Sequence, residues 1–197
     1  MSDDDTVRLM LLIIGVVFFP PALVYRLRSF TRERLDRWQE GAFILFGLRL
    51  TAAVTFVGGL LWMINPAWMA WSSLPFPMWL RWVGLAVETI GGSLVVWTFH
   101  NLGKNLTDTV VTRQEHSLVT SGPYRWVRHP FYLAGALVVL GGCLATTNWF
   151  FAIGGAIVLI FLYRRTRIEE AKLVERFGDD YRNYMRRVGR FLPRIGR

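Results

Sequence analysis

The chain has 197 residues, of which 53% are hydrophobic and 19% are charged, and its formal net charge is +9. Its mean hydropathy of +0.33 and its nine Trp and fourteen Phe exceed globular averages and predict a single-domain integral membrane protein. The basic residues cluster beside apolar segments, as at a cytoplasmic membrane face, which argues against a nucleic-acid partner. With Cys143 as its one cysteine, the chain can form neither an internal disulfide nor a cysteine metal site.

Three apolar segments in the first half of the chain are long enough to cross a bilayer as helices. They are Val7–Leu27, Gly41–Ile64 and Trp79–Leu102. A basic connector, Arg26–Glu40, follows the first, and the uncharged loop Asn65–Met78 with its tryptophans suits a membrane interface. Acidic residues precede the first segment where a signal peptide would carry basic ones, so we expect no cleavable signal.

The last apolar stretch is broken only at Asn148, which separates Phe131–Thr147 from Trp149–Tyr163. As one helix it would extend about 50 Å, well beyond a hydrocarbon core of ~30 Å. We therefore predict a tight helical hairpin that turns at Thr146–Asn148. The basic residues at its ends, Arg128 and Arg164, are expected to extend toward the membrane surface. The fold class is thus all-α, with about five transmembrane helices.

The Lys and Arg residues lie on alternate connections. Arg26–Glu40 carries five, Lys104–Arg128 four and Arg164–Arg197 eleven, whereas Asn65–Met78 and the turn at Asn148 carry none. The positive-inside rule then places the N-terminus outside and the C-terminus in the cytoplasm, as expected for a bacterial inner-membrane protein. Both polar segments of the second half lie on the cytoplasmic side and can meet.

The first of these polar segments is Leu118–Tyr132, LVTSGPYRWVRHPFY. Irregular polar backbone near a bilayer is tolerated where it lines a cavity or the aqueous edge, so chemistry is expected here. The histidines His100, His116 and His129 are too scattered for a zinc site, and no Walker A or G-x-G-x-x-G motif is present. A purely structural role, in which Pro130 starts a helix and the rings form an interfacial belt, stays open.

The second polar segment follows the hairpin. Arg165 and Glu169 are four residues apart and share a helix face, which suits a surface ion pair as well as a site. An amphipathic helix that Gly178 can interrupt is predicted by apolar residues at helical spacing: Val174, Phe177, Tyr181, Tyr184 and Val188. Such a helix can lie on anionic lipid or cover a site as a lid.

Taken together, LVTSGPYRWVRHPFY and RTRIEEAKLVERFGDDYRNY resemble the isoprenylcysteine carboxyl methyltransferase family and its bacterial and archaeal relatives, which share the pattern with the phospholipid methyltransferases. The resemblance covers Leu102 to Pro193. It implies a membrane-embedded methyltransferase that uses S-adenosyl-L-methionine without a Rossmann domain. The chain would then be one domain, with a three-span scaffold in 1–102 and the cofactor-binding catalytic half in 103–197.

By position, the resemblance assigns residues to a cofactor site and to catalysis. The cofactor-binding set is His116, Ser117, Leu118, Val119, Tyr124, His129, Pro130, Phe131, Tyr132 and Glu169. Arg165 matches the arginine assigned to the methyl-accepting substrate, so Arg165 and Glu169 are the expected catalytic pair, and no metal is implied. Eukaryotic members carry a Gln a few residues before the first histidine, in a longer segment. Here the segment Val110–Glu115 is shorter and Thr112 falls nearest to that position, so this contact is not carried over.

The acceptor is expected to be lipophilic and to enter sideways from the membrane lipids, near Glu88 or Arg49. Its identity and the oligomeric state stay open. Two other classes also remain: a nicotinamide-dependent reductase of the sterol-reductase type, whose C-terminal region carries a similar HP-x-Y element, and a membrane protein without catalysis.

Overall fold

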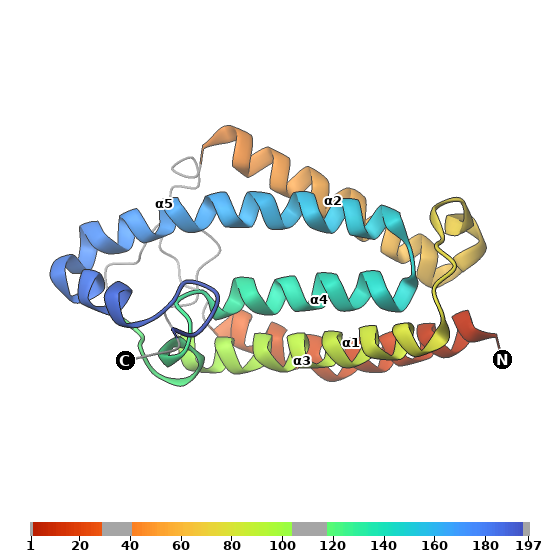
Figure 1. The fold of residues 1–197 in the computed structure, drawn as a ribbon, viewed down its shortest axis with the longest axis horizontal. Helices are drawn as coiled ribbons and strands as arrows, with labels where there is room; N and C mark the ends of the chain where they lie inside the picture. Colours follow the sequence, from red (N-terminus) through yellow and green to blue (C-terminus); the bar gives the residue numbers. More distant parts are fainter. Residues whose placement is uncertain (1, 29–40, 104–117, 195–197) are drawn as a thin grey trace.

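The computed structural model describes residues 2–28, 41–103 and 118–194, and most of these are helical (Figure 1). In this part of the chain the α-helices are α1 Asp3–Arg28, α2 Ala42–Ile64, α3 Met78–Leu102, α4 Pro130–Thr146 and α5 Trp149–Arg187. Two short 3-10 helices, η2 Pro66–Ser72 and η4 Gly122–Arg125, lie in the connections. The helices α1, α2, α3 and α5 are long and apolar enough to cross a membrane, and α4 is a shorter apolar helix. The predicted all-α membrane fold with about five spans is confirmed.

The helices of the bundle pack against one another in pairs. In Figure 1, α4 lies along α3, α1 runs beside α3, and α2 lies along α5 on the other side of the molecule. The pair α4 and α5 forms the hairpin that connects the two sides. This arrangement brings the beginning of α4 and the charged part of α5 to the same end of the bundle.

The contact between α3 and α4 depends on glycine. A Cβ on Gly141 of α4 would lie 2.5 Å from the backbone nitrogen of Glu88 on α3, and one on Gly84 would lie 2.5 Å from the backbone nitrogen of Ala145. Backbone atoms cannot move aside as a flexible side chain can. Small residues therefore permit the close approach that stabilises helix pairs in membranes.

We expect Gly141→Ala to destabilise the protein by about 1–3 kcal/mol, since the added methyl group would force the two helices apart. The matched control is Gly135→Ala on the same helix, where a Cβ meets no atom within 4 Å. Alanine has the higher helix propensity, so the control is expected to be neutral or slightly stabilising. Thermal unfolding in detergent measures both, and equal midpoints would contradict the packing argument.

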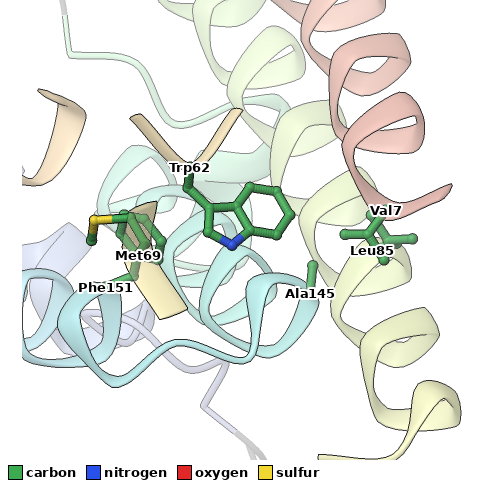
Figure 2. Close-up of a cluster of buried hydrophobic side chains, with 6 residues drawn as sticks. All are labelled: Val7, Trp62, Met69, Leu85, Ala145 and Phe151. Carbon is green, nitrogen blue, oxygen red and sulfur yellow. The ribbon is translucent and has the colours of Figure 1, made fainter. Parts of the chain in front are cut away.

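The hairpin turn lies where it was predicted. Thr147 takes a left-handed conformation (φ 50°), and the Asn148 side chain caps α5 by accepting a hydrogen bond from the Phe150 amide at 3.1 Å. The same side chain donates to the Met69 carbonyl at 3.1 Å, which ties the turn to η2. The main buried apolar cluster lies at this end and draws on every helix (Figure 2): Val7, Trp62, Met69, Leu85, Ala145 and Phe151.

At the opposite end, α5 continues past its apolar part into the charged segment. Its helical geometry breaks at Gly178, which has a positive φ of 54°, as the sequence indicated. Beyond this residue the chain turns back toward the start of α4 (Figure 1). Tyr181 and Tyr184 are buried within the protein, so the tail does not serve only as a helix on lipid.

Candidate functional site

Backbone contacts join the two polar segments. Val127 and Gly189 form a short parallel β-bridge, in which the Arg128 amide donates to the Gly189 carbonyl at 2.8 Å. The His129 amide donates in the same way to the Arg190 carbonyl at 3.1 Å. The C-terminal segment therefore lies directly against the residues that precede α4, as the hairpin topology predicted.

A buried carboxylate, Glu170 of α5, lies at the centre of this junction and is only 4% exposed. Its Oε1 accepts hydrogen bonds from Arg128 Nε at 3.0 Å and pairs with His129 Nε2 at 3.1 Å. Its Oε2 accepts from the Arg190 guanidinium. Three segments that are distant in the sequence thus converge on one side chain, and we call these four residues the Glu170 cluster.

The cluster keeps Glu170 ionised. Glu170 lies beyond the apolar part of α5, and its burial by itself raises the pKa of the carboxyl group. Hydrogen bonds from His129 and Arg190 and the charge of Arg128 outweigh that effect and lower the pKa from 4.5 to about 2. A buried charge is stable only when it is paired and hydrogen-bonded, and this one is.

The neighbouring carboxylate, Glu169, has different surroundings. It is half-buried, and its Oε2 accepts a hydrogen bond from the Tyr132 hydroxyl at 2.8 Å. The predicted site residues Tyr132 and Glu169 are therefore in direct contact, although 37 positions separate them. Because its bonded neighbour is a neutral hydroxyl rather than an arginine, Glu169 is suited to hold a cationic or hydroxyl-bearing group.

The other expected residues surround this contact. Pro130 is buried in the first turn of α4, and the Phe131 ring is 40% exposed and stacks on Phe99 with a centroid distance of 5.3 Å. His129 precedes α4 but does not cap it through its side chain. Its imidazole is instead part of the Glu170 cluster, so a purely capping role is excluded.

Residues further from α4 complete the predicted set. The carbonyl of Tyr124 accepts a hydrogen bond from the Tyr184 hydroxyl, and burial raises the pKa of Tyr124, which keeps its phenol neutral. Leu118 and Val119 are half-buried in irregular backbone. Arg165 is half-buried one turn before Glu169 on α5. His116 and Ser117 lie outside the described residues.

Two features of the site differ from expectation or were missed. Arg128 was expected to extend to the membrane surface, but its side chain is only 7% exposed because it pairs with Glu170. No role was foreseen for Glu170 or for Arg190. The sequence did contain a signal for the cluster: one motif has an Arg-His pair and the other has two adjacent glutamates. Because a buried acid requires basic partners, these residues could have been paired.

Comparison with known proteins finds one family model and several relatives that are similar to this chain. The model of the isoprenylcysteine carboxyl methyltransferase family matches residues 82–175. The human protein-S-isoprenylcysteine O-methyltransferase is 32% identical over 128 residues, which cover 64% of this chain and 45% of the human protein. Its counterpart from Saccharomyces cerevisiae is 35% identical over 116 residues, covering 57% of this chain and 48% of the yeast protein.

A solved structure agrees with these sequence matches. The eukaryotic intramembrane Ras methyltransferase, an isoprenylcysteine carboxyl methyltransferase, superposes with a TM-score of 0.57 at 28% identity. The match covers 75% of this chain and 52% of that one. The present chain spans about half the length of the curated relatives it matches. The shared motifs, the matched residues and the common fold make this chain similar to the isoprenylcysteine carboxyl methyltransferase family.

Proposed function

We propose that this protein is a membrane-embedded methyltransferase that takes its methyl group from S-adenosyl-L-methionine. The acceptor we propose is a lipophile that carries a carboxylate, such as an isoprenylcysteine, which enters from the bilayer. The observation that carries the proposal is the hydrogen bond between Tyr132 and Glu169, which joins the two family motifs at one place. The match to the family model supports the use of a methyl donor.

The residues at this contact fit the chemistry of the proposed cofactor. S-adenosyl-L-methionine carries a positive sulfonium and amino group together with ribose hydroxyls, and when bound it supplies an electrophilic methyl group. The Glu169 carboxylate, held at the start of α4 by Tyr132, can accept hydrogen bonds from such groups. The exposed ring of Phe131 offers an apolar surface beside it. His116, Ser117, Leu118, Val119 and Tyr124 are proposed to complete the binding site.

Methyl transfer to a carboxylate requires mainly that the acceptor is aligned with the methyl donor and that water is excluded, because no strong acid or base is needed. Arg165 is proposed to pair bidentately with the acceptor carboxylate and to orient it. The Glu170 cluster does not touch the reacting groups in this proposal. It positions Glu169 by fixing α5 against the residues before α4.

The distribution of charge supports a cytoplasmic site. Arg26 and Arg28 end α1, and the basic tail lies at the same end of the bundle (Figure 1). The connection through η2 carries no charge. We therefore propose that the site faces the cytoplasm of a bacterial cell and that the N-terminus lies outside.

The function is tested by cofactor binding to the purified protein in detergent. We expect saturable binding of S-adenosylhomocysteine and none of NADPH, followed by transfer of a radiolabelled methyl group from S-adenosyl-L-methionine to N-acetyl-S-farnesylcysteine. Binding of NADPH alone would instead support a reductase of the sterol-reductase type. Binding of neither compound would contradict both enzymatic assignments.

A further inference from the structure

A cavity of about 390 Å³ lies among the helices and opens to the outside of the bundle, away from the Glu170 cluster. All five helices contribute to its wall, which is mainly apolar and includes Trp62 and Phe151. Gly142 lines it from α4, about 18 Å along that helix from Pro130 at 1.5 Å per residue. The volume is within the usual range for small-molecule sites. The cavity is therefore a separate feature, closer to the hairpin turn.

The cavity wall contains one ionisable carboxyl group, that of Glu88 on α3. Its Oε2 atom is buried and makes no hydrogen bond to any residue in the described ranges. That oxygen lies 3.9 Å from the position that a Cβ on Gly142 would occupy. The carboxyl group therefore lies in the wall of the cavity beside α4.

An unpaired carboxylate within a membrane helix is expensive, and such residues usually face a partner or a pathway. Among the described residues that line this cavity, there is no lysine or arginine to neutralise Glu88. A bound cation is the partner that would allow Glu88 to be ionised there, because the resulting pair is neutral overall. A neutral alcohol would contribute one hydrogen bond only, and a hydrocarbon would contribute none.

The cavity also has a route to the lipid. Phe56 and Leu60 of α2 line it, and both are exposed on the outer surface of the bundle, Phe56 by 67%. A molecule can therefore reach the cavity from the bilayer along α2 without passage through water. The occupant should therefore be an amphiphile whose apolar part is soluble in the membrane.

We propose that this cavity binds a lipophilic ammonium compound, whose cationic head pairs with the Glu88 carboxylate and whose alkyl chain fills the apolar space among α2, α4 and α5. The site is distinct from the Tyr132–Glu169 contact. Its occupancy does not depend on the proposed methyl transfer.

The test is saturable binding of radiolabelled dodecylamine to the full chain, purified in a maltoside detergent. We expect Glu88→Gln, which keeps the shape of the side chain but not its charge, to weaken binding at least tenfold. The matched control is Glu175→Gln, an exposed glutamate of α5, which should bind as the wild type does. Unlabelled 1-dodecanol should displace the amine only at concentrations at least tenfold above those of unlabelled dodecylamine.

A second variant keeps the test decisive if Glu88→Gln does not fold. Gly142→Leu places a side chain in the cavity while Glu88 remains, and it should abolish saturable amine binding. Retention of binding by either variant would overturn the proposal. Equal displacement by the alcohol, or no saturable binding to the wild type, would also overturn the proposal. The cavity would then be occupied by lipid acyl chains only.

Discussion

Glu170→Gln is expected to lower the free energy of unfolding by about 3–5 kcal/mol, because it leaves buried basic side chains without their counter-charge. Arg128 and His129 bond to Oε1 and Arg190 bonds to Oε2, whereas glutamine keeps only one of these oxygens. An amide cannot accept from all of these donors, and its own NH₂ group would face them. Denaturant unfolding in mixed micelles measures the loss, with Glu175→Gln as the exposed control. A loss no larger than that of the control would contradict the central place of Glu170.

The same carboxylate has a predictable dependence on pH. Its pKa in the folded protein is about 2, below the ordinary value of 4.5. Its stabilising contribution is therefore complete above about pH 4.5 and is lost as the pH falls toward 2. The stability difference between the wild type and Glu170→Gln should shrink over that interval.

Arg165→Ala is expected to reduce turnover at least 100-fold while the affinity for S-adenosylhomocysteine stays within about threefold, since the lost guanidinium orients the acceptor in the transition state. Glu169→Gln should instead affect cofactor binding. It is expected to lower the affinity for S-adenosylhomocysteine by about 10–100-fold, which is the contribution of hydrogen bonds to a charged group. Equilibrium binding and single-turnover methyl transfer measure the two effects separately.

Tyr132→Phe is the matched control for this pair of variants. It removes only the hydroxyl that donates to Glu169 Oε2, so cofactor binding should weaken less than in Glu169→Gln. Arg165→Lys retains the charge but not the bidentate fork, and should restore a part of the turnover. Equal losses of binding and turnover in Arg165→Ala would contradict the separate roles of the two residues.

Much of the fold follows from local sequence signals. Apolar segments of adequate length located the helices. The last apolar stretch was too long for one membrane-spanning helix, and its break at Asn148 marked the hairpin turn. In the structure the Asn148 side chain caps the following helix. Gly178 was likewise identified as an interruption of the amphipathic tail. Each of these features depends on residues close together in the chain.

The partners of Glu170 could not be predicted in the same way. Glu169 and Glu170 are adjacent, and only the rotation of α5 about its axis decides which of them faces the arginines. That rotation is set by helix packing across the whole bundle. Arg128 is 42 positions away from its partner, and Arg190 reaches it only after the chain reverses at Gly178. The residues that hold the site together were therefore harder to identify than those expected to bind ligands.

The reversal at Gly178 determines which medium the apolar face of the tail meets. A Cβ at this position would touch no atom within 4 Å, so the requirement is for backbone conformation and not for space. Were α5 to continue straight, the rings of Tyr181 and Tyr184 would face lipid headgroups or water. With the turn, they form an interior wall of the protein, and Arg182 remains exposed outside it. A single residue thus decides whether this segment is a peripheral membrane anchor or a part of the protein interior, although the amphipathic pattern would be the same in both.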